Sequence, residues 1–357
     1  MNQAQEETLE QARVSIVVPT YNRRDALERC LDSLARQTHS NYEIIVIDDG
    51  STDDTPQFLE RFAAAHSDLN FRRLRNEPNL GANPSRNRGI HEATGSFIAL
   101  VDNDCVAEPD WLEKLMRGFT SPRVAAVVGR VHSPKPRNIY DLTLKGTQRL
   151  PGPGPAPRLV SCNLCVRRDL LLTHLFDEDR ATPAPKRDGI VDETVSGRGD
   201  EEGLYLMLRA AGYEQLVVAD AIVLHEHHHT RRSFFKQAFR GGRSAARLVY
   251  KYGLPPRLDM LPFMLTYLSL PLILLHGWLA WAPVLFFAAA LAAITYNDLA
   301  RKGKTIVETL LSFPMLLVYY HVRLVGYVGE SLKLRLRPNS IERNPSLGRI
   351  KASDNRL

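Results

Sequence analysis

Two aspartates separated by one residue, Asp102 and Asp104, follow the apolar run Phe97–Val101. Side chains at alternate positions of an extended chain point to the same side, so this spacing predicts that both carboxylates face one ion. Hard divalent cations such as Mg²⁺ and Mn²⁺ bind oxygen ligands and commonly share them with substrate phosphates. A polar turn that closes a buried strand uses the same residue types, and the surrounding elements distinguish the two interpretations.

Short apolar runs alternate with helical patterns before these acids. Strands are predicted at 14–18, 43–47 and 71–74, and a fourth ends at Asp102. The first helix places apolar residues at spacings of three and four: Leu27, Cys30, Leu31 and Leu34. The alternation predicts a parallel sheet with helices on both faces. Ligands of such sheets bind outside the carboxyl ends of the strands, which here carry Thr20, Asp48, Asp49, Asp102 and Asp104.

Four motifs occur in order along this region: Ser15–Asn22, Val46–Ser51, Arg86–Gly89 and Asp102–Asp104. Together they resemble the successive motifs of family-2 glycosyltransferases, from about residue 13 to about residue 230. The resemblance implies an α/β fold of the GT-A type, a nucleotide-diphospho-sugar transferase with a Rossmann-like mixed sheet. It also implies an inverting transfer of a sugar from a nucleotide-diphosphate donor, with a UDP-sugar as the favoured donor.

The resemblance implies a role for each motif. Nine residues would bind the nucleotide-sugar: Pro19, Thr20, Tyr21, Asn22, Asp48, Asp49, Arg86, Asp102 and Asn103. Asp102 and Asp104 would hold the donor diphosphate through a divalent cation, Mn²⁺ or Mg²⁺. His225 resembles the histidine that completes this metal site in many relatives. A separate zinc site in the cluster 225–229 is disfavoured, because neither a cysteine nor a second histidine lies at ligand spacing.

The chemistry requires a further acid. Loss of a nucleoside diphosphate builds negative charge on the leaving group, which a metal cation stabilises as a Lewis acid. The acceptor hydroxyl is a poor nucleophile and needs a base within hydrogen-bond reach. The segment 199–213 resembles the family's acid pair at the start of a helix, where relatives usually have Glu-Asp with the Asp as base. This chain has Asp200-Glu201 there, and we predict Glu201 as the base, with Asp200 as the alternative.

Two further residues are predicted beside the acceptor. Asn163 lies in a segment, 161–169, that is similar to the family strand on the acceptor side. Glu202 follows the acid pair, although an acid in a first helical turn also complements the helix dipole. The four cysteines, in 357 residues without a secretory leader, fit a reduced cytosolic setting and are predicted to be core residues: Cys30, Cys105, Cys162 and Cys165.

A basic segment follows the predicted catalytic region. Between Thr230 and Leu258 there are eight Lys or Arg residues and no acid. Five of them recur at helical spacing: Lys236, Arg240, Arg243, Arg247 and Lys251. Such a segment predicts an amphipathic helix on anionic membrane lipids, and the alternative is a solvated helix of a soluble domain. Nucleic acid is not a predicted partner, because the strand ends carry acids.

Residues 260–296 contain no Asp, Glu, Lys or Arg. This length allows two membrane spans of roughly 17 to 20 residues each, joined by a turn near Gly277. Basic residues flank both ends, so the positive-inside rule predicts a hairpin in the inner (plasma) membrane with the catalytic domain in the cytoplasm. A third apolar region contains Pro314, His321 and Arg323 and is predicted to be an amphipathic or re-entrant helix.

The predicted order of domains begins with a polar tail (1–12). There follow a GT-A glycosyltransferase domain (13–230), a basic interfacial helix (231–257), a transmembrane hairpin (258–297), an amphipathic or re-entrant helix (305–332) and a loose tail (338–357).

Membrane attachment raises the local concentration of membrane-bound substrates, so the predicted acceptor is a lipid-linked or other glycan. A processive polysaccharide synthase is a weaker alternative, because the sequence contains no Gln-x-x-Arg-Trp motif. A non-catalytic membrane scaffold that kept the fold is an alternative from another class. An ATPase or a dehydrogenase is disfavoured, because neither phosphate-binding glycine motif follows the first strand. The sequence leaves the sugar, the linkage and the oligomeric state open.

Overall fold

The computed structural model describes residues 9, 11–146, 150, 152–176, 201–226, 228–253, 261–274 and 277–336. The predicted polar and loose tails therefore fall largely outside the described residues. The chain divides into two compact units. The first, the sheet unit, comprises 1–134, 148–196 and 200–227; the second, the helical unit, comprises 135–147, 197–199 and 228–357. The segment 135–147, which the sequence places within the catalytic domain, thus belongs to the helical unit.

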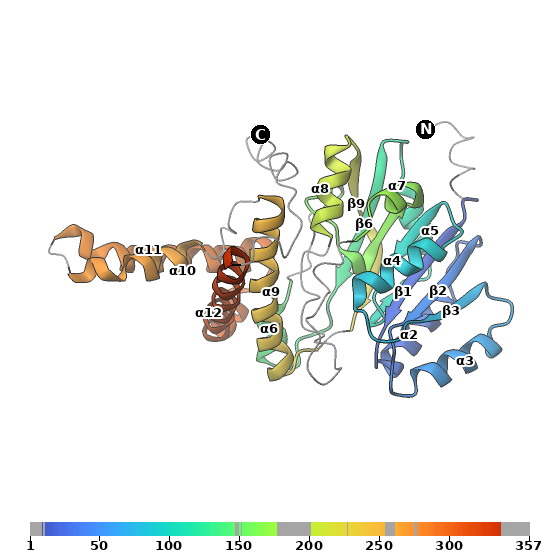
Figure 1. Cartoon of the computed structure of the whole chain (residues 1–357), viewed down its shortest axis with the longest axis horizontal. Helices are drawn as coiled ribbons and strands as arrows, with labels where there is room; N and C mark the ends of the chain where they lie inside the picture. The colour runs from blue at the N-terminus through green and yellow to red at the C-terminus, as the bar shows by residue number, and fades with distance from the viewer. Residues whose placement is uncertain are drawn as a thin grey trace. The chain divides into compact units, whose positions relative to one another are not determined.

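The sheet unit is built on a nine-stranded sheet (Figure 1). Its first half is parallel, in the order β3-β2-β1-β4, and consists of β1 (Val14–Thr20), β2 (Tyr42–Asp48), β3 (Phe71–Arg75) and β4 (Phe97–Leu100). The second half continues as β8-β6-β9-β5, with β7 paired to β9. Its strands are β5 (Cys105–Ala107), β6 (Val124–His132), β7 (Gly154–Pro155), β8 (Leu164–Arg167) and β9 (Glu214–His225).

The second half of the sheet mixes strand directions. β8 runs antiparallel to both β4 and β6, and β5 runs antiparallel to β9, whereas β6 and β9 are parallel. The sheet is therefore mixed and Rossmann-like, which confirms the predicted fold class. The parallel half matches the strand-helix alternation of the sequence, because that pattern is local.

Helices connect and cover the strands of the sheet unit: α2 (Arg24–Leu34), α3 (Thr55–Ala65), α4 (Ala82–Glu92), α5 (Trp111–Arg117), α7 (Arg168–Thr173) and α8 (Glu202–Ala210). The predicted apolar face of α2 is buried, because each of its four residues at helical spacing has no exposed surface. α4 lies close to β1 at Gly89, where an added Cβ would come within 2.5 Å of a methyl group of Val17.

The segment that carries the two acids differs from the prediction. β4 ends at Leu100, and residues 102–104 leave the strand in a turn before β5 begins at Cys105. The amide of Cys105 donates to the carbonyl of Asp102 at 3.0 Å. The prediction of an extended chain through Asp104 is therefore wrong, because these polar residues form the turn that carries the chain from β4 to pairing with β9. In this turn the side chains of Asp102 and Asp104 do not alternate as they would in a strand.

The described residues of the helical unit form five α-helices: α6 (Ile139–Leu144), α9 (Arg231–Tyr252), α10 (Leu261–Ser269), α11 (Ala282–Tyr296) and α12 (Ile306–Leu336). Shorter turns lie between them: η3 (Leu270–Leu274), η4 (Trp278–Trp281) and the π-helical η5 (Asn297–Arg301). α9 begins with a capping box between Thr230 and Ser233 and ends at Gly253 in the left-handed conformation. Both features satisfy backbone groups that have no hydrogen-bond partner within the helix.

α9 and α12 pack along each other with very close backbones. An added Cβ at Gly242 would lie 1.9 Å from the carbonyl oxygen of Arg323, and one at Gly326 would lie 2.3 Å from that of Phe239. Arg243 and Arg247 of α9 bind the two carboxylate oxygens of Glu330 at 2.8 and 2.7 Å. These two members of the predicted basic stripe therefore face α12, in contrast to the predicted stripe along a lipid surface.

Within the part of the chain that the structure describes, two helices are long and apolar enough to cross a membrane, by length and composition: Leu279–Arg301 and Ile306–Leu336. The first half of the predicted hairpin is shorter in the structure than a membrane span, because the apolar helix there covers only Leu261–Leu274. Its α-helical part ends at Ser269, ahead of Pro271, which lacks the amide that continues a helix. The region predicted as an amphipathic or re-entrant helix (305–332) forms α12, a continuous helix of 31 residues with Pro314 inside it.

Candidate functional site

The register of the sheet brings distant segments to one edge. β4 ends at Leu100, which pairs with Leu164, the first residue of antiparallel β8. The residues just before Leu164 therefore lie at the same edge as the turn that carries the acids. His225, the last residue of β9, pairs with Cys105, the first residue of β5. The carboxyl ends of β1 and β2 also lie side by side at their edge of the sheet.

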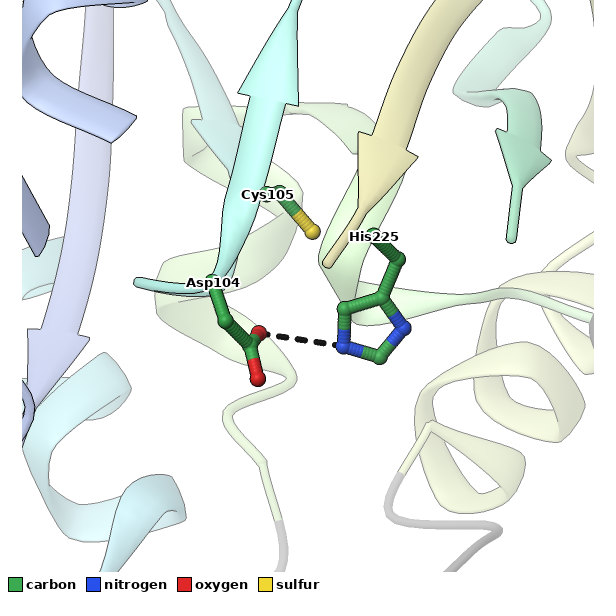
Figure 2. Close-up of side chains that lie close together, drawn as sticks. All are labelled: Asp104, Cys105 and His225. Atoms are coloured by element: carbon green, nitrogen blue, oxygen red, sulfur yellow. Dashed lines mark ion pairs between the residues drawn. The ribbon is translucent and has the colours of Figure 1, made fainter. Parts of the chain in front are cut away.

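Asp104 and His225 form the centre of this edge. The imidazole Nε2 of His225 lies 3.0 Å from Oδ1 of Asp104, and Arg23 Nη1 donates to Oδ2 at 3.3 Å. Ligand atoms of Asp104, Cys105 and His225 all lie within 4.8 Å of one another, and among the described residues this is the group of three that could hold a metal ion. Figure 2 shows these three side chains converging from β5 and the end of β9.

The protonation of this group follows from its surroundings. Burial would lower the pKa of His225, but the hydrogen bond and the charge of Asp104 outweigh burial and raise that pKa to about 10. Burial raises the pKa of the Cys105 thiol well above its usual range, with the neighbouring Cys162 as the next cause. Without a cation, the group therefore holds an imidazolium-carboxylate pair beside a neutral thiol.

Asp102 has different partners from Asp104. Its Oδ1 accepts a hydrogen bond from Arg86 Nη2 at 2.8 Å, and Arg86 is buried and also donates to Asn83. The intervening Asn103 donates to the hydroxyl of Thr20 at 2.9 Å. Four predicted nucleotide-binding residues therefore meet at the ends of β1 and β4. Asp102 lies outside the group of three converging ligands, so its role as a metal ligand stays a prediction.

Asp48 and Asp49 are buried and engaged with the protein. Arg75 donates to Asp48 at 2.5 Å. Asp49 accepts hydrogen bonds from Asn76 Nδ2 at 2.7 Å through one oxygen and from the amide of Gly81 at 2.7 Å through the other. In this structure Asp49 therefore shapes the loop after β3, and Asp48 joins the end of β2 to the end of β3. Nucleotide binding by these two residues stays a prediction.

Pro19, Tyr21 and Asn22 lie at the end of β1. Pro19 is within the strand, Tyr21 is half-buried in the following bend, and Asn22 adopts the left-handed conformation with φ of 50°, which asparagine tolerates better than most residues. The side-chain oxygen of Asn22 accepts a hydrogen bond from the amide of Thr52 at 2.7 Å. Asn22 thus ties the loop after β1 to the loop after β2.

Glu201 is held at the edge that carries the acids. Its Oε1 accepts a hydrogen bond from the amide of Ser161 at 2.8 Å, and Ser161 lies three residues before the start of β8, in the turn η1 (Ser161–Asn163). Glu202 is the first residue of α8 and is half-buried. Asp200, the alternative base, lies outside the described residues.

Asn163 does not face an acceptor in this structure. It is completely buried, and its Oδ1 accepts a hydrogen bond from the Trp111 indole at 2.8 Å. Its Nδ2 lies 3.0 Å from the carbonyl oxygens of Arg130 and Ala221. The prediction of an acceptor contact overlooked that a buried amide must satisfy its hydrogen bonds within the protein.

Sequence reasoning missed Cys105 and Arg23. Cys105 directly follows the predicted acids, and this adjacency was a signal. Its pairing with His225 spans 120 residues, however, and depends on the strand register. Arg23 follows the Ser15–Asn22 motif and reaches Asp104 over a separation of 81 residues. Neither contact follows from local spacing.

The residues at this edge fit a divalent cation. A carboxylate and an imidazole are common ligands of Mn²⁺ and similar ions, and Asp104 and His225 place one of each 3.0 Å apart with little exposure. An ion between them would replace the proton that joins them, because metal ligands bind in deprotonated form. The set leaves remaining positions for phosphate oxygens or water.

Comparison with known proteins finds a family model that matches part of the chain. Residues 15–165 match the model of glycosyl transferase family 2. The chain is 32% identical over 120 residues to the glycosyltransferase AglE of Haloferax volcanii, which covers 33% of this chain and 39% of that protein. It is 34% identical over 122 residues to the glycosyltransferase GlyA of Streptococcus pneumoniae, covering 34% of this chain and 17% of that protein. The matched stretch is thus well under two-thirds of the length of either relative.

The fold is also that of a solved transferase. The mannosyltransferase PcManGT from Pyrobaculum calidifontis, solved in complex with GDP-Man and Mn²⁺, superposes with a TM-score of 0.57. The match covers 89% of this chain and 87% of that protein at 20% identity. Fold, motifs and family match agree with the predicted resemblance, and the chain therefore carries, over residues 15–165, a family 2 glycosyltransferase domain of the GT-A type.

Proposed function

We propose that this chain is a membrane-associated inverting glycosyltransferase that moves a sugar from a nucleotide-diphosphate donor to a lipid-linked or glycan acceptor. The observation that carries the proposal is the convergence of Asp104 and His225 at the sheet edge that also carries Arg86, Asp102 and Glu201. A UDP-sugar is the donor that we propose first. A GDP-sugar is the second candidate, because the mannosyltransferase of similar fold was solved in complex with GDP-Man.

Asp104 and His225 would hold a divalent cation, Mn²⁺ or Mg²⁺, with Asp102 as a proposed further ligand. When bound, such an ion supplies Lewis-acid stabilisation of the charge on a departing diphosphate. Arg86 adds a fixed positive charge at the same edge, since its buried guanidinium is held by Asp102 and Asn83. Preorganised charges of this kind stabilise a developing anion without reorganisation.

Glu201 would act as the general base in the transfer. Its carboxylate would accept the proton of the acceptor hydroxyl while the hydroxyl oxygen attacks the anomeric carbon opposite the diphosphate. A single displacement of this kind inverts the configuration at that carbon. The hydrogen bond from the amide of Ser161 supports this role, because it fixes one carboxylate oxygen of Glu201 beside the start of β8.

The helical unit supports association with a membrane. α11 is apolar on all sides, and large side chains on it are exposed, among them Val284, Leu285 and Phe287. α12 likewise exposes Leu310, Leu311 and Val325. A helix that is apolar all round requires an apolar environment. Large exposed apolar patches mark surfaces that contact a membrane or another protein. We propose the inner membrane as that environment, with the sheet unit in the cytoplasm.

Donor hydrolysis tests the catalytic proposal. The wild type and the variant Asp104→Ala are compared with a panel of nucleotide-sugars, with Mn²⁺ or Mg²⁺ added. Removal of one cation ligand should reduce the rate at least a hundredfold, whereas Asp68→Ala, an exposed acid after α3, should retain the wild-type rate. Thermal stabilisation by the same panel identifies the donor by its nucleotide and its sugar. Equal rates for Asp104→Ala and the wild type would exclude the enzyme and favour a scaffold.

A further inference from the structure

Three different donor atoms converge at the sheet edge: a carboxylate oxygen of Asp104, the sulfur of Cys105 and an imidazole nitrogen of His225 (Figure 2). Two of them come from neighbouring residues and the third from a strand more than a hundred residues away. Cys105 is completely buried and Asp104 is 8% exposed. The convergence is therefore part of the folded sheet and does not depend on mobile surface side chains.

The backbone explains why the three side chains share one side. Cys105 and His225 pair directly across the antiparallel strands β5 and β9, and directly opposed residues place their side chains on the same face. Asp104 is adjacent to Cys105 and would point to the other face if it were in a strand. It lies instead in the turn before β5, and its carbonyl accepts a hydrogen bond from the amide of Glu226 at 2.7 Å. The turn brings its carboxylate back to His225.

The sulfur distinguishes this set from an oxygen-rich site for a hard cation. Mg²⁺ and Mn²⁺ prefer oxygen ligands, whereas thiolate sulfur selects softer ions such as Zn²⁺. Zinc sites that exchange ligands have three protein ligands and one open position, and their ligand atoms lie about 3.3 to 3.5 Å apart in a tetrahedron. The three atoms here lie within 4.8 Å of one another, so closing the set requires side-chain shifts of about 1 Å.

We propose that Asp104, Cys105 and His225 form a binding site for Zn²⁺, with the fourth position open to water or a phosphate oxygen. On binding, the thiol proton and the imidazole proton that bonds Asp104 leave to solvent, and the ion takes their places. Asp104 and His225 would then be unavailable to a Mn²⁺ or Mg²⁺ ion that accompanies a nucleotide-sugar donor. Inhibition of transfer by Zn²⁺ follows from the proposed function, whereas zinc binding itself does not depend on it.

Cobalt spectroscopy tests the site directly, since Co²⁺ replaces Zn²⁺ and absorbs in the near ultraviolet when a thiolate is its ligand. The whole wild-type chain in detergent is titrated with Co²⁺, and the bound ion is then displaced by Zn²⁺. We expect thiolate-to-cobalt absorption that disappears on addition of one equivalent of Zn²⁺. Absence of this absorption in the wild type would overturn the proposal, whatever the variants do.

Two cysteine variants locate the sulfur. Cys105→Ser should abolish the absorption and weaken Zn²⁺ binding at least tenfold, while changing Mn²⁺ affinity less than threefold. Cys165→Ser is the matched control, because Cys165 is also completely buried but lies outside the group of three. Its absorption and Zn²⁺ affinity should equal those of the wild type. Loss of absorption in the control but not in Cys105→Ser would overturn the assignment.

The two proposals fail separately. If Mn²⁺-dependent donor hydrolysis is found without thiolate-to-cobalt absorption, the zinc site is excluded and the glycosyltransferase proposal stands. If Zn²⁺ binds through Cys105 but no nucleotide-sugar is hydrolysed or bound, the zinc site stands and the proposed function fails. Zn²⁺ that binds at Cys105 without slowing Mn²⁺-dependent hydrolysis would exclude the inhibitory role.

Discussion

Glu43 brings a carboxylate into the interior of the sheet unit at the start of β2. It is 1% exposed and accepts hydrogen bonds from the hydroxyl of Ser15 at 2.7 Å and from the amide and hydroxyl of Thr94 at 2.8 and 2.6 Å. Burial alone would raise the pKa of Glu43, but these hydrogen bonds outweigh it and lower the pKa below its ordinary value. The ionised form therefore stabilises the folded state.

The contribution of Glu43 should depend on pH in a defined direction. Because the folded-state pKa is lowered, the stabilisation is complete above the unfolded-state pKa of about 4.3 and is lost as the pH falls through the folded-state value. Glu43→Gln should lower the free energy of unfolding by about 2 to 3 kcal/mol at pH 7, and the difference should shrink toward pH 3. Denaturant unfolding across this range measures it. Glu60→Gln, an exposed acid on α3, should change stability by less than about 0.5 kcal/mol at every pH.

Residue types and spacing could predict which residues gather at the functional edge, but not how each is used. Thr20, Asp102 and Asn103 do meet, because their motifs end the neighbouring strands β1 and β4, and Arg86 reaches Asp102 from α4. The sequence could not show that the side chain of Asn163 forms its hydrogen bonds with Trp111 and backbone carbonyls. Hydrogen bonding of buried polar groups depends on contacts between residues far apart in the chain, and local spacing carries no record of them.

At the level of elements, α9 and α12 of the helical unit pack with their backbones in close contact. Gly242 and Gly326 allow their backbones to approach, and Glu330 joins two arginines of α9 with only 4% of its surface exposed. A buried charge without its partners is strongly destabilising. The ion pairs therefore favour one register of α9 against α12, and the close contact at the two glycines favours the same register.

Two adjacent glycines should respond in opposite ways to alanine. A Cβ at Gly242 would overlap the backbone of α12, whereas a Cβ at Gly241 has no neighbour closer than 3.9 Å. Gly242→Ala should destabilise the helical unit by about 1 to 3 kcal/mol, and Gly241→Ala should leave it unchanged or stabilise it by up to about 1 kcal/mol through helix propensity. Thermal unfolding in detergent, followed by circular dichroism, measures both. Equal effects would contradict the close contact.

Elements were predictable where their pattern is local. The predicted strand 43–47 corresponds to β2, which extends it by one residue at each end. The pairing of β5 with β9 was not predictable, because β5 has three residues and its partner lies far along the chain. A helix was predicted at 305–332, where α12 lies, but a membrane span was not predicted there because Pro314 and Arg323 argue against a span in isolation. Its packing against α9 buries the Arg323 side chain and so accommodates it.

Across the whole molecule, the two units differ in how far their apolar residues are buried. Apolar strands of the sheet unit such as β1 and β2 are almost entirely buried. In the helical unit, by contrast, only 17% of the apolar window in 279–301 is buried within the protein. The proposed membrane association rests on this contrast and on the absence of charges from 260–296 in the sequence.

A charge in the middle of α11 should weaken membrane retention. Ala289 is exposed near the centre of this candidate span, and a lysine at a span centre costs about 3 kcal/mol on insertion. Ala289→Lys should lower the fraction of the whole chain that stays in the membrane after an alkaline carbonate wash. Ala64→Lys, at an exposed position of α3, is the matched control and should be retained like the wild type. Equal retention of both variants would argue against a span at α11.

Lys304 lies just before α12 and is completely enclosed, where its ammonium donates to Asp298 at 2.6 Å and to the carbonyl of Thr143 in α6 at 3.1 Å. The two ends of the second bond are 161 residues apart. At about 5 to 20 residues per second, a ribosome takes about 8 to 32 seconds to make the chain between them. Throughout that interval the carbonyl of Thr143 lacks Lys304, although Phe234 of α9, which packs against Leu144 of α6, is made earlier. The enclosed ammonium can therefore join α6 only after α9 and α11 have been synthesised.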